Sequence, residues 1–149
     1  MLRQYFCGQE RRQSRQRIIT HLERYAIPAT YTIIADEIAD IQSNIKKAVD
    51  AGTSLVLITG GTGLSPRDVT PEAVRPLLNR EIDGIAETLR NYGQDRTPYA
   101  MLSRRVAGTI GNTLVIALPG STKGASESMD ALFPAVLHIF KVLKGGRHE

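Results

Sequence analysis

Three glycines in four positions, Gly60, Gly61 and Gly63, follow directly after the apolar run 54–59. Glycines let the main chain turn sharply, and such a turn can present several N–H groups to one anion. The loop is not a P-loop, since no Gly-Lys-Ser/Thr follows it. It is not the dinucleotide fingerprint either, since Pro66 stands where the third glycine would be. The loop therefore either holds a phosphate group or is a plain turn after a strand.

Asp68 lies between this loop and a predicted helix start at Thr70 and Pro71. Threonine is a good N-cap and proline is favoured at the first helical position, so the helix needs no cap from Asp68. A carboxylate beside an anion-binding loop repels a bare anion, but it suits a phosphate that arrives with a divalent metal. The alternative is an aspartate that only stabilises an Asx-turn.

Two other segments carry polar groups at predicted strand ends. Asp36 ends one strand, and its default interpretation is the N-cap of a helix over 37–51. The segment PGSTKG, 119–124, resembles a first helical turn with free N–H groups, two hydroxyls and Lys123, which makes it a second candidate anion site. Lys123 could equally be a solvated surface lysine.

Short strand-like segments alternate with helical patterns along the chain. The predicted strands are 29–36, 54–59 and 113–118, the last one preceded by a strand-like piece and a turn at Gly111. The predicted helices begin near residues 37, 70 and 121, and Pro134 should interrupt the last of them. This alternation predicts an α/β fold with a mostly parallel sheet, in which ligands bind at the carboxyl ends of the strands. Asp36, the glycine loop and PGSTKG all fall at such ends.

Composition favours one globular domain in a reducing cytoplasm. The chain has 149 residues, of which 42% are apolar and 23% charged, and it contains one cysteine. No apolar run is long enough to predict a membrane span. The net charge of +4 equals the surplus of five arginines over one glutamate within residues 1–17, so the rest of the chain is neutral. This distribution argues against a nucleic acid as the partner, and we expect no membrane partner either.

The segments LVLITGGTGLSPRDVTPEA and MLSRRVAGTIGNTLVIALPGSTKGASESM together resemble the molybdopterin adenylyltransferase family. This is the MogA and MoaB type, which includes the G-domain of gephyrin, and the match runs in order from about Ile18 to Leu143. The resemblance implies a three-layer α/β sandwich, usually a homotrimer and possibly a higher oligomer. It also implies transfer of AMP from Mg-ATP to the terminal phosphate of molybdopterin, with release of pyrophosphate. A molybdenum insertase that acts afterwards is a possible partner.

The resemblance also implies roles for individual residues. The family's strand-end aspartate falls on Asp36 and its RDVTP aspartate on Asp68, and both are expected to be catalytic and to meet Mg²⁺ through Mg-ATP. The residues expected to bind the ligands are Thr59, Gly60, Gly61, Thr62, Gly63, Pro66, Ser103, Pro119, Gly120, Ser121 and Lys123.

Residues 1–17 depart from the family pattern, which opens with a strand, a serine-aspartate loop and an acidic residue shortly before a glycine. Here the segment reads MLRQYFCGQERRQSRQR, with Arg15 where the glycine should be, and we expect no opening strand in it. We therefore divide the chain into an atypical segment 1–17 and a molybdopterin-binding domain 18–145. The segment is either aberrant, through a displaced reading frame, or replaces the first strand with LRQYF as a poor substitute. An altered start leaves open a second function, a non-catalytic pterin-binding or scaffold module that oligomerises.

Overall fold

A single six-stranded sheet forms the centre of the molecule, for which a computed structural model describes residues 4–8 and 12–147, with side chains for 12–147. The strand order is β2-β1-β3-β6-β5-β4. The strands are β1 (Gln4–Gly8), β2 (Thr30–Ile33), β3 (Leu55–Thr59), β4 (Arg80–Glu81), β5 (Ala107–Ile110) and β6 (Thr113–Leu118). β2 pairs in parallel with β1, β1 with β3, and β3 with β6. β5 pairs antiparallel with both β6 and β4. The sheet is therefore mixed but mostly parallel, as predicted.

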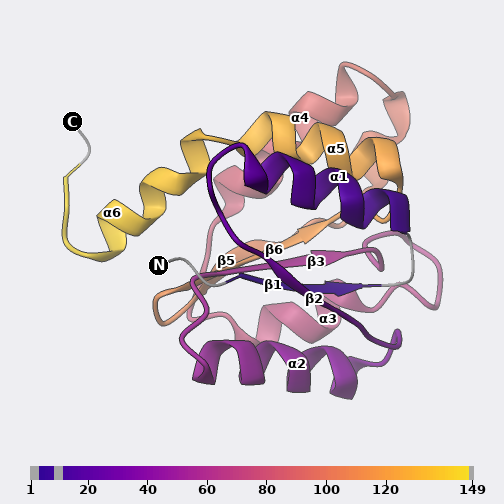
Figure 1. Cartoon of the computed structure of the whole chain (residues 1–149). Coiled ribbons are helices and arrows are strands. Elements are labelled where there is room, and N and C mark those ends of the chain that lie inside the picture. Colours follow the sequence, from indigo (N-terminus) through magenta and orange to yellow (C-terminus); the bar gives the residue numbers. More distant parts are fainter. Residues whose placement is uncertain (1–3, 9–11, 148–149) are drawn as a thin grey trace.

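Helices cover both faces of this sheet (Figure 1). The α-helices are α1 (Arg12–Glu23), α2 (Ile38–Asp50), α3 (Thr70–Val74), α4 (Asp83–Gln94), α5 (Thr122–Leu132) and α6 (Ile139–Leu143). The 3-10 turns are η1 (Arg75–Leu77), η2 (Pro98–Leu102) and η3 (Ala135–His138). Helices α1, α4 and α5 lie on one face, and α2 and α3 on the other. The expected three-layer α/β sandwich is confirmed.

The two central strands are buried on both faces because their side chains alternate between two cores. Leu55 and Leu57 of β3 point into the core under α1, α4 and α5, whereas Val56 and Ile58 point into the core under α2 and α3. Each of these four side chains is at most 1% exposed. The continuous apolar run 54–59 is typical of such a doubly covered parallel strand. The burial of β3 on both faces holds its carboxyl end in place.

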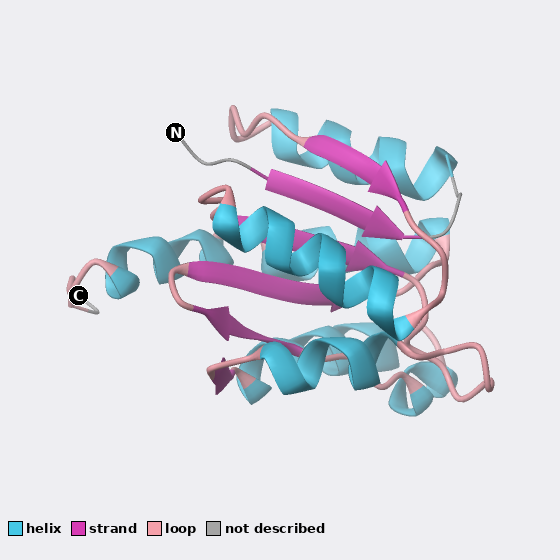
Figure 2. Ribbon diagram, turned by 90° about the horizontal axis from the view of Figure 1, so that it is seen from below, coloured by secondary structure: helices cyan, strands magenta, loops and turns pink. Residues whose placement is uncertain are grey.

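Most predicted elements lie close to their observed positions. The strand expected over 29–36 is shorter, because β2 spans only Thr30–Ile33 and leaves Asp36 in the following loop. Pro134 interrupts the last helix as predicted, since α5 ends at Leu132 and α6 starts at Ile139. In Figure 2 the parallel strands point the same way, so the loops that follow them gather at one edge of the sheet. All candidate chemistry was predicted at that edge.

The expectation that the chain lacks an opening strand is wrong. β1 forms within the atypical segment and lies between β2 and β3, parallel to both, with Phe6 opposite Tyr31 on one side and Leu57 on the other. A substitute strand is thus present in the central slot, as the second alternative for this segment allowed. The boundary that we expected at residue 18 falls inside α1.

Candidate functional site

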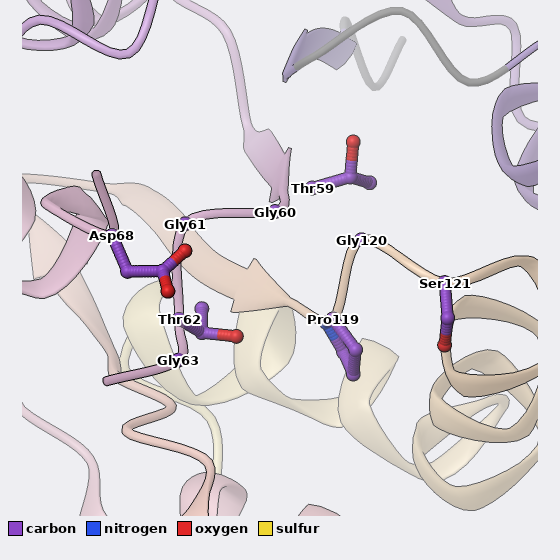
Figure 3. A pocket seen from close by; sticks show the side chains of 9 residues that line it. All are labelled: Thr59, Gly60, Gly61, Thr62, Gly63, Asp68, Pro119, Gly120 and Ser121. Atoms are coloured by element: carbon purple, nitrogen blue, oxygen red, sulfur yellow. The ribbon is translucent and has the colours of Figure 1, made fainter. Parts of the chain in front are cut away.

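A cavity of about 340 Å³ opens at the carboxyl ends of β3 and β6 (Figure 3). Two loops and one carboxylate line it, and the lining residues are Thr59, Gly60, Gly61, Thr62, Gly63, Asp68, Pro119, Gly120 and Ser121. The structure thus brings together the glycine loop and the start of PGSTKG, which lie far apart in the sequence. Eight of the eleven expected ligand-binding residues line this one cavity, together with Asp68.

The glycine loop turns through two residues with left-handed backbone, Gly60 (φ +90°) and Gly61 (φ +70°). A Cβ at Gly61 would collide with the hydroxyl of Thr70. That hydroxyl donates a 2.9 Å hydrogen bond to the carbonyl oxygen of Gly60, and the Thr70 N–H donates to the carbonyl oxygen of Gly61. Thr70 therefore holds the loop and does not cap α3, whose N-cap is Val69 without a side-chain cap bond. The prediction that Thr70 is the N-cap is wrong, because its hydroxyl is already engaged.

The two loops approach each other closely across the cavity floor. Gly60 donates its N–H to the carbonyl oxygen of Leu118 at 3.0 Å, and a Cβ at Gly120 would lie 3.1 Å from the Cα of Gly60. Ser121 caps α5, since its hydroxyl oxygen accepts the N–H of Gly124 at 3.0 Å. The first turn of α5 thus begins at the cavity, as PGSTKG predicted, and its remaining N–H groups favour negative charge there.

Asp68 lies at the open side of the glycine loop. Its Oδ2 accepts the N–H of Ser65 at 3.0 Å, while its own N–H donates to the carbonyl oxygen of Ser65 at 2.9 Å. An Asx-turn aspartate accepts from a residue further along the chain, so that alternative is wrong for Asp68. Within the described residues, Oδ1 makes no hydrogen bond and remains available to a ligand.

Asp36 does not line the cavity, but it lies within electrostatic reach of Asp68. Burial raises the pKa of the Asp36 carboxyl above its ordinary value, the negative charge of Asp68 raises it further, and Arg67 opposes both. Asp36 does not cap α2, because the N-cap is Glu37. Its default interpretation as a helix cap is therefore wrong. Asp36 is instead a carboxyl group close enough to Asp68, which lines the cavity, for the charge of Asp68 to act on it.

This pair suits Mg²⁺ better than a metal that needs an all-protein site. In residues 12–147 no group of three or more His, Cys, Asp or Glu side chains is placed to hold an ion. Mg²⁺ is commonly held by one or two carboxylates and takes its remaining ligands from water and substrate phosphates. Mutual repulsion of two carboxylates is what a bound cation would relieve. The residues present therefore fit a magnesium ion that arrives with a phosphate-bearing ligand.

Arg104 fixes the glycine loop from outside, a role that the sequence did not reveal. Its Nε donates to the carbonyl oxygen of Gly63 at 2.8 Å and its Nη2 to the carbonyl oxygen of Asp68 at 2.7 Å. Its Nη1 pairs with Glu72, and this hydrogen bond lowers the pKa of the Glu72 carboxyl. Its backbone N–H donates to Thr62. No spacing rule links Arg104 to a loop about forty residues earlier, so only the fold could show this contact.

Three expected ligand-binding residues lie outside the cavity. Lys123 is exposed, with its Nζ 3.9 Å from the Glu127 carboxylate. Ser103 lines a neighbouring apolar groove of about 350 Å³ that also includes Leu64 and Tyr99. Pro66 lines neither of these two hollows. Direct ligand contacts of these three residues stay predictions.

A family model described as a probable molybdopterin binding domain matches residues 7–138. The chain belongs to this molybdenum cofactor biosynthesis family. The match covers the glycine loop, Asp36 and Asp68, and the start of α5, so the whole cavity lies within the molybdopterin-binding-domain region. A molybdopterin-binding domain is consistent with a cavity whose main-chain N–H groups can bind a phosphate.

Solved structures of this family share the fold over nearly the whole chain. A molybdopterin biosynthesis protein from Mycobacterium abscessus is 32% identical, with a TM-score of 0.89 and 96% of each chain covered. The molybdopterin biosynthesis enzyme MoaB from Thermus thermophilus is 37% identical, with a TM-score of 0.86 and 100% of each chain covered. These values confirm the predicted α/β fold.

Curated relatives include both longer and similar-sized proteins. A molybdenum cofactor biosynthesis bifunctional protein of Chlorobaculum tepidum is 41% identical over 78% of this chain, and Dictyostelium discoideum gephyrin is 47% identical over 76%. The chain spans only 38% and 16% of those two proteins. It spans 70% of molybdenum cofactor biosynthesis protein B of Staphylococcus aureus, at 42% identity. No described helix combines the length and the apolar character that crossing a membrane requires.

Proposed function

We propose that the chain transfers AMP from Mg-ATP to the terminal phosphate of molybdopterin, as a step of molybdenum cofactor biosynthesis. The observation that carries the proposal is the Asp36 and Asp68 pair beside a glycine-lined cavity at the carboxyl edge of the sheet. Membership of the family makes molybdopterin the expected substrate. The two carboxylates are the groups that could hold the metal ion of a metal-bound nucleotide. Neither feature alone would suggest nucleotidyl transfer.

The cavity can bind phosphate groups through its main chain. The Gly60 N–H is engaged with Leu118, but the N–H groups that follow it in the glycine loop and those in the first turn of α5 can approach a phosphate from two sides, which is how protein loops commonly hold phosphate. In the proposed complex the residues of the glycine loop bind the phosphates, while Arg104 and Thr70 keep the loop in place. Asp36 and Asp68 are the groups that would hold Mg²⁺, which supplies positive charge to neutralise the phosphate oxygens.

The reaction needs no nucleophile from the protein. A phosphate oxygen of molybdopterin attacks the α-phosphorus of ATP, a new P–O bond forms, and the bond to the bridging oxygen breaks so that pyrophosphate leaves. Phosphoryl-type transfers depend mainly on positioning and charge neutralisation. The described side chains that line the cavity fit such a role, since they include the Asp68 carboxylate and hydroxyls but no cysteine or histidine.

Assembly and partners complete the proposal. We propose a homotrimer that works together with a molybdenum insertase, which would consume the adenylylated pterin. The bifunctional relative and gephyrin support such a partner, because both are longer proteins of which this chain matches one part. Size measurement in solution by light scattering tests the trimer.

Asp68→Asn tests the role of the carboxylate pair. This change keeps the shape of the side chain but removes its charge, so transfer should fall by roughly a hundredfold or more if Mg²⁺ positioning is lost, while molybdopterin binding remains. Glu81→Gln is the matched control, because Glu81 is a surface carboxylate that pairs with Arg75 away from the cavity. Equal transfer by Asp68→Asn and Glu81→Gln would refute the metal assignment.

A further inference from the structure

Three cations share a single carboxylate where α4 meets the start of α5, and a fourth lies close to one of them. Glu127 Oε1 lies 3.8 Å from Arg96 Nε and 3.9 Å from Lys123 Nζ, so neither contact is a hydrogen bond. Arg105 and Arg90 lie within electrostatic reach of the same place. Helices α4 and α5 lie side by side on one face of the sheet (Figure 1). Glu127 cannot balance Arg96, Lys123 and Arg105 together.

Arg105 is the unusual member of this group. The residue is only 9% exposed, and its Nε donates to the hydroxyl of Ser103 at 3.1 Å. Burial lowers the pKa of the Arg105 guanidinium, and the neighbouring Arg90 lowers it further. Among the described carboxylates only Glu127 acts on it in the opposite direction. Buried charges are normally paired, but the carboxylate that acts on Arg105, Glu127, is also the ion-pair partner of Arg96 and Lys123.

Apart from the shared Glu127, the contacts of the arginines hold them in place without neutralising them. Arg90 Nη1 lies 3.5 Å from the carbonyl oxygen of Ser103, on the same residue that anchors Arg105. Arg96 stacks on the ring of Tyr92 at 3.5 Å and donates to its carbonyl oxygen at 2.6 Å. The partners are hydroxyl, carbonyl and aromatic groups. Preorganised donors of this kind lower the entropic cost of binding an anion.

We propose that Arg90, Arg96, Arg105 and Lys123 form a second anion site, which binds a compact phosphate anion carrying several negative charges. None of the four side chains lines the cavity at the glycine loop, so the two sites are distinct. Guanidinium groups match phosphate oxygens with paired N–H donors, and several of them together favour a multiply charged anion over a single carboxylate. The inference stands on these contacts and does not depend on the proposed adenylyl transfer.

Inorganic pyrophosphate without Mg²⁺ is a suitable probe, followed by amide NMR of the full chain. Saturable shifts are expected at the end of α4, at residues 103–105 and in the first turns of α5, and they should weaken with added salt. Arg105→Met should weaken pyrophosphate binding by about tenfold or more, since a charge-assisted hydrogen bond is lost. Shifts confined to Gly60–Gly63, with unchanged affinity in Arg105→Met, would overturn the proposal.

Exposed positions keep the test decisive even where the buried arginine cannot be replaced without unfolding. Lys123→Gln should weaken binding by about twofold to fivefold, whereas Lys141→Gln, a surface lysine on α6, should leave it unchanged. Glu127→Gln should tighten binding severalfold, because it removes the competing carboxylate. If Glu127→Gln weakens pyrophosphate binding, or if Lys123→Gln and Lys141→Gln behave alike, the cations serve only the internal contacts of the fold.

Discussion

Asp36 and Asp68 lie within electrostatic reach of each other although they follow different strands and neither caps a helix. Burial raises the pKa of Asp36, and the charge of Asp68 raises it further. A neighbouring negative charge disfavours the ionised form of a carboxyl group such as Asp36, and a bound cation would oppose that effect. The pair therefore costs some stability that a magnesium ion would restore.

The repulsion can be measured directly. Because the negative charge of Asp68 raises the pKa of Asp36, Asp68→Asn should lower that pKa toward its ordinary value, without reaching it, since burial persists. The folded state of the wild type then holds the Asp36 proton to higher pH than the unfolded state does. The stability of the wild type should accordingly fall, relative to Asp36→Asn, as pH rises through the raised pKa of Asp36. Carboxyl-carbon NMR titration gives the pKa, and one that does not change in Asp68→Asn would contradict the pairing.

The glycine loop gives a second prediction, on stability. Gly61→Ala and Gly52→Ala both place alanine at a positive φ, which costs about 1 kcal/mol. Only Gly61 also has the Thr70 hydroxyl where a Cβ would lie, whereas nothing lies within 4 Å at Gly52. Gly61→Ala should therefore destabilise the chain by about 1–3 kcal/mol more than Gly52→Ala. Equal denaturation midpoints for Gly61→Ala and Gly52→Ala would show that the glycine loop can shift to make room for the added methyl group without a cost in stability.

Arg104 gives a third prediction. Arg104→Met removes donors to Gly63 and Asp68 and the pairing with Glu72, so it should cost about 2 kcal/mol of unfolding free energy and weaken phosphate binding in the cavity. Arg75→Met is the control, because Arg75 pairs only with Glu81 at the surface and should cost less than about 1 kcal/mol. Chemical denaturation measures both variants. If Arg75→Met lowered the unfolding free energy as much as Arg104→Met, the hydrogen bonds of Arg104 to the glycine loop would not explain the loss.

A fourth prediction concerns β1, the strand that the sequence analysis missed. Phe6→Pro removes a backbone N–H from a strand that is paired on both sides, which should cost about 3 kcal/mol or more. The melting temperature should fall accordingly. A melting temperature equal to that of the wild type would mean that residues 4–8 contribute little to the central sheet.

The success and failure of the sequence analysis have physical causes. The continuous apolar run of β3, the glycines after it and the cap at Ser121 are local signals, so the sheet edge and most of the cavity could be predicted. LRQYF was expected to be at best a poor substitute strand because it mixes polar and apolar residues, but a slot between β2 and the buried strand β3 can order a segment of weak intrinsic preference.

Side-chain engagement at the site was harder to predict. The Thr70 hydroxyl was expected to cap α3. In the folded chain it instead donates its hydrogen bond to the carbonyl oxygen of Gly60. The sequence analysis assigned no role to Arg104, whose partners also lie far away along the chain. A contact between residues far apart in sequence leaves no trace in local spacing, so such roles emerge only from the fold.

The most direct test of the central claim is transfer of label from ATP carrying a radioactive α-phosphate. With molybdopterin and Mg²⁺, the account predicts that label appears on the pterin, with one pyrophosphate released for each labelled pterin, and that a chelator abolishes both. Binding of molybdopterin and ATP without labelled pterin, in the presence of Mg²⁺, would contradict the account and identify the chain as a non-catalytic pterin-binding module.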